Sequence, residues 1–269
     1  MPLTMHNQTY ETLLLDSPAP HILLVTLNRP DAANAFNTQM ATDLVHCFEQ
    51  LALKQADYRC TILTGAGERA FCAGGDLKER DGMSNAAWTA QHLIYERMIR
   101  AVLDCPVPII AAVNGAAYGG GCELAAGVDF VYAAERARFA MTETSLGIIP
   151  GAGGTQTLAR ALGERRAMEL IMSARPFSAT EAMQWGLVNA VFAGDQLLTE
   201  TLKTAEAIAA NAPVAVRQAR QAIHRGLQMS ISDGLAFEIE AYHRTVPTSD
   251  RREGVRAFVE KRKPEFKGE

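Results

Sequence analysis

The chain has 269 residues, of which 48% are hydrophobic and 21% are charged, with 26 basic against 30 acidic side chains. So much apolar side chain excludes an intrinsically disordered protein. The net charge of −4 argues against a protein whose main task is to bind nucleic-acid phosphates. A chain of this length forms one large domain or two ordinary ones, and either buries enough surface to fold without a metal or a disulfide.

The first two thirds of the chain alternate short apolar runs with amphipathic stretches. The predicted strands are residues 21–27, 58–64, 109–113, 130–132 and 138–140. Asn37 is a predicted N-cap of the first long helix, whose apolar face begins at Met40. A second long helix is predicted around residues 86–103. This alternation favours an α/β fold.

Helical periodicity takes over from residue 155 onward, where glycine becomes rarer. The last predicted helices are residues 197–210, 214–227 and 231–242. The composition changes near residues 190–195 without a linker rich in proline or serine. We therefore predict an α/β core in residues 1–195, with residues 196–269 forming a helical extension packed on it.

No stretch of the sequence predicts a membrane segment. The two longest apolar stretches, residues 22–25 and 107–113, are far shorter than the roughly 20 residues that a spanning helix needs. Residues 1–10 have neither the pattern of a secretory signal nor that of a transit peptide. We expect a cytoplasmic protein without membrane association, with a processed mitochondrial matrix protein as the alternative.

The five cysteines are odd in number and lack paired C-x-x-C spacing, so they predict neither a disulfide framework nor a zinc site. We expect buried thiols in a reducing compartment and no metal. Cys122, beside Glu123, is the one that could lie near chemistry, but the sequence marks no base that would activate it as a nucleophile.

The sequence contains three glycine clusters, at residues 65–67, 119–121 and 151–154. None has the spacing of a dinucleotide-binding site or of a P-loop. Residues 119–126 instead indicate a turn that runs into a helix, and residues 71–77 have the same form. Amides at a helix start lack partners, and glycine lets them approach a ligand oxygen, so two such turns can form an oxyanion hole. Tight turns that merely permit close packing are the alternative.

Two glutamates stand among small and apolar residues. Glu123 lies just inside an apolar helix, where a buried glutamate is not expected for stability, and Glu143 has similar neighbours. Two carboxyls held close together in a dry site have their pKa values pushed apart, which leaves one as acid and one as base. Two unrelated glutamates at helix starts, stabilised by helix dipoles, explain the residues equally well at this point.

Three segments resemble the signatures of a known family. They are residues 70–79 (AFCAGGDLKE), 110–124 (IAAVNGAAYGGGCEL) and 143–156 (ETSLGIIPGAGGTQ). Their order and spacing, with further agreement from residue 27 to residue 263, resemble the enoyl-CoA hydratase/isomerase (crotonase) superfamily. The resemblance implies a spiral of repeated ββα units, followed by a C-terminal helical region that serves trimerisation. It also implies a homotrimer or a dimer of trimers.

The same resemblance assigns roles to residues of the predicted turns and helices. It implies that the amides of Gly75 and Gly120 hold a thioester oxygen, that Glu123 and Glu143 are the acid/base pair, and that Gly151 lies near the attacking water. The implied reaction is syn hydration of a 2-enoyl-CoA to a 3-hydroxyacyl-CoA. Because many members with another activity lack one glutamate and this chain has both, hydration is preferred. No cofactor is implied, since the coenzyme A thioester is the substrate.

Further substrate contacts are implied along the path of the CoA. The matching positions are Arg29, Ala33, Ala73, Asp76, Leu77, Lys78, Tyr242 and Lys261. Residues 251–269 carry seven basic against four acidic side chains, which suits a phosphate-bearing ligand although a solvated helix face is the usual explanation. Trp88, His92, Tyr95 and Met98 lie where relatives line the acyl pocket, and we expect most of them to be ordinary helix core.

Three alternatives remain open from the sequence. Residues 76–80 and 246–269 also resemble the methylglutaconyl-CoA hydratase branch, which would change only the substrate. A Δ3-Δ2-enoyl-CoA isomerase would use the same fold. An RNA-binding relative is the non-enzymatic alternative, and an isoelectric point near 5.9 without interleaved aromatic and basic residues argues against it. Acyl length, branching and pathway are not encoded in any readable pattern.

Overall fold

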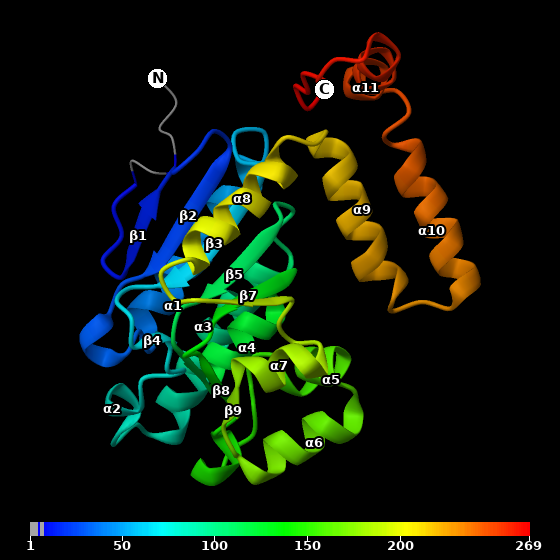
Figure 1. Ribbon diagram of the computed structural model, residues 1–269. Coiled ribbons are helices and arrows are strands. Elements are labelled where there is room, and N and C mark those ends of the chain that lie inside the picture. Colours follow the sequence, from blue (N-terminus) through cyan, green and yellow to red (C-terminus); the bar gives the residue numbers. More distant parts are fainter. Residues whose placement is uncertain (1–4, 6–7) are drawn as a thin grey trace.

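The structure is a computed structural model that describes residue 5 and residues 8–269. The expectation that residues 1–10 hold no targeting signal therefore falls partly outside the described residues. Two sheets lie at the centre of the molecule and helices cover them (Figure 1).

The larger sheet has six strands in the order β1-β2-β3-β5-β7-β10. The strands are β1 (Leu13–Asp16), β2 (Ile22–Leu27), β3 (Cys60–Gly65), β5 (Ile109–Val113), β7 (Phe130–Ala134) and β10 (Ala190–Phe192). β1 is antiparallel to β2, and the other neighbouring pairs are parallel. All residues of β3 and β5 are buried, as expected for parallel strands covered on both faces.

The smaller sheet explains how the chain winds. Its strands are β4 (Ala70–Cys72), β6 (Ala116–Tyr118), β8 (Arg138–Ala140) and β9 (Phe177–Ser178), in that order. The successive pairs β3–β4, β5–β6 and β7–β8 each give one strand to the larger sheet and the next to the smaller one. Helices follow β4 and β6, so the chain repeats a ββα unit and advances as a spiral. The predicted fold class is confirmed.

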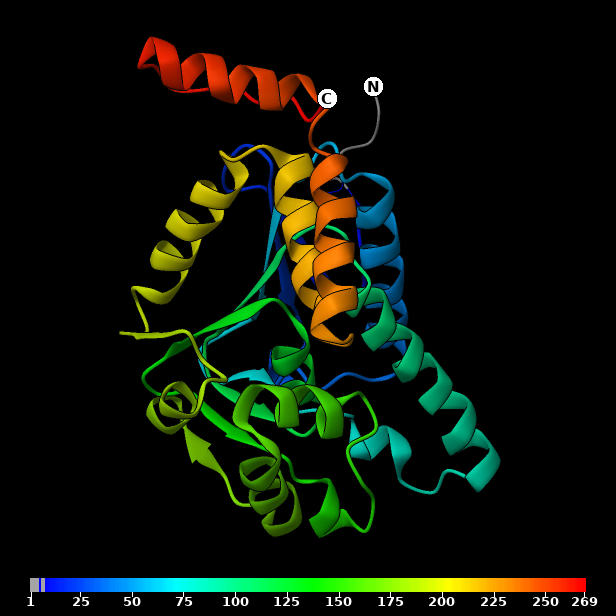
Figure 2. The same cartoon turned by 90° about the vertical axis from the view of Figure 1, so that its right-hand side faces the viewer.

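Helices cover both faces of the larger sheet. α1 (Thr38–Leu53) and α3 (Asn85–Leu103) pack together on one side, and α8 (Leu197–Ala209) covers the other (Figure 2). The predicted N-cap is confirmed, since the Asn37 side chain accepts a hydrogen bond of 3.0 Å from the Met40 amide. Below the sheet lie α2 (Leu77–Arg80), α4 (Gly120–Gly127), the 3₁₀ turn η3 (Glu143–Leu146), α5 (Gly154–Leu162), α6 (Glu164–Ser173) and α7 (Ala179–Trp185).

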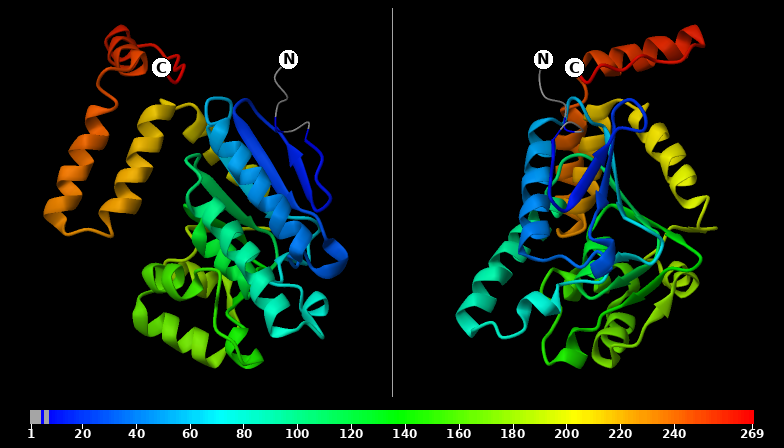
Figure 3. Two further views of the ribbon diagram at one scale, coloured as in Figure 1. Left: turned by 180° about the vertical axis from the view of Figure 1, so that it is seen from behind. Right: turned by 90° about the vertical axis from the view of Figure 1, so that its left-hand side faces the viewer.

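The last three helices leave the body of the molecule and form what we call the C-terminal arm, residues 213–260. α9 (Pro213–Gly226) and α10 (Ile231–His243) make an antiparallel pair beside the sheets, and α11 (Ser249–Glu260) lies at the end of that pair (Figures 1 and 3). α8 packs on the sheet, whereas α9 meets the body through polar side-chain contacts, such as the ion pair of 2.6 Å between Arg220 and Asp129. Within the described residues, no helix combines the length and apolarity needed to cross a membrane.

The predicted elements match the structure where the sequence pattern is long. The five predicted strands and the long helices are present, with ends shifted by a few residues. β1, β4, β6, β9 and β10 were not predicted, because each has only two to four residues and shows no readable alternation. All five cysteines are free and buried, which confirms the prediction of buried thiols.

Candidate active site

A cavity of about 90 Å³ lies where the two glycine turns meet, beneath α3. Seven of the residues to which the resemblance assigns a catalytic or CoA-binding role line it: Ala73, Gly75, Leu77, Gly120, Glu123, Glu143 and Gly151. Segments far apart in the chain, from Phe36 to Ala152, therefore contribute to one small site.

The first amide of the predicted oxyanion hole belongs to Gly75. Phe36 donates to the Gly74 carbonyl (2.8 Å) and accepts from the Asp76 amide (3.0 Å). This short parallel bridge uses the neighbours of Gly75 and does not use the Gly75 N–H itself. The N–H thus remains available to a ligand in the cavity.

The second amide belongs to Gly120, the first residue of α4. The first N–H groups of a helix have no partner within it and lie at its positive end. The hydrogen bonds of this turn run from the Cys122 and Glu123 amides to the Gly119 carbonyl and do not use the Gly120 N–H, and Gly120 lines the same cavity as Gly75.

Glycine is required where these two turns touch. A Cβ on Gly121 would lie 2.0 Å from the Cys72 carbonyl oxygen, so no side chain fits there. Gly74 has φ +89°, a region that glycine favours, and its Cβ would lie 2.8 Å from the Tyr118 carbonyl oxygen. Close packing of the two turns is therefore confirmed, and it brings Gly75 and Gly120 to one cavity. Their role as an oxyanion hole stays a prediction.

Glu123 is a buried carboxyl held by main-chain donors. It is 3% exposed, and its Oε1 accepts hydrogen bonds from the amides of Ala152 (2.8 Å) and Gly154 (2.7 Å). Burial raises the pKa of Glu123 to about 7; the neighbouring Glu143 also raises it, while the amide donors lower it. Its carboxyl therefore gains and loses a proton near neutral pH.

Glu143 begins η3 on the other side of the cavity. It is 7% exposed, and its buried Oε2 has no hydrogen-bond partner within the described residues. Burial raises the pKa of this carboxyl as well. A buried polar atom without a partner is rare in folded proteins, and here it is explained if a ligand or a water completes the site.

Cys122 lies next to Glu123 but does not join this chemistry. Its side chain is fully buried, and burial raises the pKa of its thiol, so the thiol stays protonated. The expectation that no base activates it agrees with this burial.

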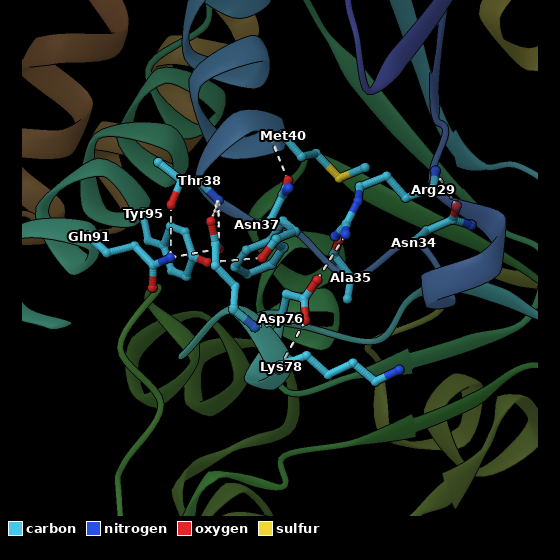
Figure 4. Close-up of polar contacts among 12 residues, drawn as sticks. Arg29, Asn34, Ala35, Asn37, Thr38, Met40, Asp76, Lys78, Gln91 and Tyr95 are labelled. Atoms are coloured by element: carbon cyan, nitrogen blue, oxygen red, sulfur yellow. Dashed lines mark hydrogen bonds and ion pairs between the residues drawn. The ribbon is translucent and has the colours of Figure 1, made fainter. Parts of the chain in front are cut away.

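Several of the residues implied for CoA binding lie beside the cavity on the strand-to-helix turns. Arg29 donates to the Ala35 carbonyl (2.6 Å) and forms an ion pair of 2.9 Å with Asp76, which caps α2 (Figure 4). Ala33 is half-buried at the end of the turn that follows Arg29, and Lys78 is exposed on α2. None of these four side chains lines the cavity itself, and their contact with the CoA stays a prediction.

The other two implied CoA contacts lie elsewhere. Tyr242 is 63% exposed on α10, and Lys261 is exposed just after α11. Both belong to the C-terminal arm or its end, and neither lines the cavity of its own chain.

The structure adds residues that the sequence analysis did not assign. The amides of Ala152 and Gly154 hold Glu123, and the glycine cluster at the start of α5 was the available signal. Of the four candidates for the acyl pocket, His92 and Tyr95 line the cavity, whereas Met98 is buried in the main core. Phe36 and Arg80 also line it, and no motif pointed to them.

A ββα spiral that brings two unpaired amides and two buried carboxyls to one cavity defines a site for acid–base chemistry on a carbonyl compound. The family model described as enoyl-CoA hydratase/isomerase matches residues 19–269. The chain therefore belongs to the enoyl-CoA hydratase/isomerase family, and the predicted resemblance is confirmed.

Individual relatives agree with this assignment. A Bacillus subtilis protein named as an enoyl-CoA hydratase/isomerase is 45% identical over 258 residues, which is 96% of this chain and 99% of that one. A short-chain-enoyl-CoA hydratase of Clostridium acetobutylicum is 40% identical and covers 91% of this chain and 93% of its own. The crystal structure of an enoyl-CoA hydratase from Bacillus anthracis has a TM-score of 0.94 at 44% identity, over 96% of this chain and 100% of that one.

Proposed function

We propose that this chain is an enoyl-CoA hydratase, a hydro-lyase that adds water reversibly and syn to a 2-enoyl-CoA to give a 3-hydroxyacyl-CoA. The observation that carries the proposal is that Glu123 and Glu143 line the same cavity as the amides of Gly75 and Gly120. The names of the relatives at 40–45% identity support it.

The main-chain donors account for the electrostatic part of the reaction. Attack of water at C3 moves negative charge onto the thioester oxygen as an enolate. The N–H groups of Gly75 and Gly120 are fixed by the fold before the reaction starts, so they stabilise this charge without reorganisation. Loss of one such donor typically costs about 3 kcal/mol of transition-state stabilisation.

The carboxyls account for the proton transfers. The Ala152 and Gly154 amides favour the ionised form of Glu123, so we assign it as the base that takes a proton from water. Glu143 has an unpartnered oxygen in a dry setting that favours its neutral form, so we assign it as the acid that protonates C2. The coenzyme A thioester is the substrate, and we propose that the reaction uses no cofactor.

We also propose that the protein works as a trimer or a dimer of trimers in a reducing compartment such as the bacterial cytoplasm. Exposed apolar side chains along the C-terminal arm support an association, and five free buried cysteines support a reducing compartment. Coverage of the CoA by a neighbouring arm would give Tyr242 and Lys261 their implied roles.

The test uses crotonyl-CoA and the purified protein. Hydration removes the ultraviolet absorbance of the conjugated enoyl thioester, and mass spectrometry identifies the 3-hydroxybutanoyl product. An unchanged spectrum at high enzyme concentration would remove the proposal. Formation of the same absorbance from a 3-enoyl-CoA, without hydration, would instead favour the isomerase.

A further inference from the structure

The ring of Phe36 lies next to both glycines of the oxyanion hole. Phe36 is 2% exposed and lines the active-site cavity, two residues before α1 begins. Outside the turn and helix of Gly120, the three atoms nearest to a Cβ built on that residue all belong to the Phe36 ring, and the Cβ would overlap Cζ. A Cβ on Gly75 would lie 3.9 Å from Cε2 of the same ring. One side chain therefore separates the two amides.

The main chain of Phe36 sets the direction of the first amide. Its N–H donates to the Gly74 carbonyl (2.8 Å), and its carbonyl accepts from the Asp76 amide (3.0 Å). The Gly74 carbonyl and the Gly75 N–H belong to one planar trans peptide unit, so they point in opposite directions. The hydrogen bond that holds the carbonyl on Phe36 therefore also fixes where the Gly75 N–H points.

Tyr95 of α3 holds Phe36 in turn. Its hydroxyl donates to the Phe36 carbonyl at 2.9 Å (Figure 4), and the two rings meet edge to face with their centres 4.8 Å apart. Burial raises the pKa of Tyr95, so the hydroxyl keeps its proton and stays a donor. Because this proton is already used on Phe36, the hydroxyl acts through that residue.

We propose that Tyr95 and Phe36 are positioning residues, which set the direction of the Gly75 N–H and its separation from the Gly120 N–H. This inference rests on the proposed function, because the two amides form the oxyanion hole of that reaction. Fixed donors stabilise an oxyanion only at the place where its charge develops, and a misplacement of about 1 Å can cost about 100-fold in rate.

The first test removes one hydroxyl and keeps its ring. In Tyr95→Phe, kcat for crotonyl-CoA should fall about 10-fold while KM changes by less than about 2-fold, since a misplaced donor is missed mainly in the transition state. The loss should stay below the 100-fold or more that removal of a whole donor costs, because Phe36 keeps both hydrogen bonds to the Gly75 turn. Tyr132→Phe is the matched control: its hydroxyl pairs with Thr204, away from the cavity, and neither constant should change.

The second test measures the polarisation of the bound carbonyl. Butanoyl-CoA labelled with ¹³C at the thioester carbonyl cannot be hydrated, and hydrogen bonds to its oxygen lower the C=O stretching frequency. We expect the infrared spectrum of the complex to show a lowered frequency, and Tyr95→Phe and Phe36→Leu each to reverse part of that shift. Phe48→Leu truncates a fully buried phenylalanine of α1 that does not line the cavity, so it should keep the whole shift. A purely structural role would lower stability without moving this frequency.

The outcomes separate this inference from the proposed function. An unchanged carbonyl frequency in Tyr95→Phe and Phe36→Leu would overturn the positioning role even where the unmodified protein hydrates crotonyl-CoA. If Phe36→Leu does not fold, the frequency in Tyr95→Phe decides alone. Absence of any shift in the unmodified protein would overturn the role too, because no oxyanion hole would then exist to be positioned. A shift that the variants lose, in a protein that hydrates no enoyl thioester, would support Tyr95 and Phe36 and remove the hydratase.

Discussion

The body of the molecule and the C-terminal arm differ in how far their helices and strands bury their side chains. In the body, β3 and β5 are buried throughout, and even two glutamates are enclosed. In the arm, α10 buries only Ala241. Large apolar side chains of the arm are exposed instead: Ile223, Leu227, Ile231, Leu235, Ile239, Val255, Phe258 and Val259. The arm therefore presents an apolar surface that another copy of the chain can cover.

In the body, the free energy of folding and the chemistry of the site place opposing demands on the same side chains. Enclosure of two carboxyls costs the body free energy, and the same enclosure tunes them for proton transfer. The arm encloses the carboxyl of Asp250, which accepts hydrogen bonds from the Lys267 and Gly268 amides, and it pairs Glu253 with Arg256 and Arg262. None of these arm carboxyls lines the active-site cavity.

The largest effect is expected from neutralising either buried carboxyl. Glu123→Gln and Glu143→Gln should each lower kcat/KM for hydration by more than about 100-fold, the scale of a positioned acid or base. In Glu123→Gln the side-chain amide oxygen can still accept from Ala152 and Gly154, so the fold should persist. Steady-state kinetics with crotonyl-CoA and circular dichroism check both statements. Near-normal turnover in either variant would contradict its assigned role.

The next effect concerns stability as a function of pH. The folded pKa of Glu123, about 7, lies above the ordinary value of 4.5, so the folded state binds more protons between these pH values. This contribution to stability is complete below pH 4.5 and is lost as pH rises through 7. At about 1.4 kcal/mol for each pKa unit, Glu123→Gln should gain roughly 3 kcal/mol over the unmodified protein at pH 8, and nothing at pH 4. Urea unfolding at both pH values measures the difference.

The arm supplies the matched control for that pH profile. Arg262 and then Arg256 lower the pKa of Glu253, so its contribution to stability is present at neutral pH and is lost as pH falls through the lowered value. Glu253→Gln should therefore be less stable than the unmodified protein at neutral pH. Its change in unfolding free energy is opposite in sign to that of Glu123→Gln. The same sign for both variants would refute the contrast between body and arm.

A smaller effect is expected from one methyl group placed in each region. Gly121→Ala puts a Cβ 2.0 Å from a backbone oxygen and should destabilise the body by about 1–3 kcal/mol. In Gly234→Ala the new Cβ would lie 3.4 Å from the Gly226 carbonyl oxygen of α9, an ordinary contact distance, so a gain of about 0.5–1 kcal/mol is expected for this position in α10. Thermal unfolding of both variants measures whether each substitution raises or lowers the stability. Destabilisation by Gly234→Ala would show that the arm is packed as tightly as the body.

The sequence predicts those parts of the site whose residues lie close together in the chain. Gly120 and Glu123 share one turn and helix start, so their spacing carried the signal. No local motif marks Arg80 as a residue of the cavity. Its place there depends on packing against α3, where its Nε donates to Gln91 eleven residues later in the chain. The short strands of the smaller sheet were missed for the same reason, since their pairing is decided by neighbours distant in the chain.

The smallest effect on folding, and the sharpest distinction between the regions, is expected from Leu235→Gln in the arm. Leu235 is 55% exposed in the single chain, so its replacement should change the unfolding free energy of the monomer by less than about 0.5 kcal/mol. The same change should weaken association, because a polar amide would enter an interface otherwise made of apolar side chains. Light scattering over a dilution series measures the assembly mass of the variant and of the unmodified protein. An unchanged assembly mass at every concentration would place the interface on another surface, and a monomeric unmodified protein would leave the exposed face of the arm without the partner that we propose.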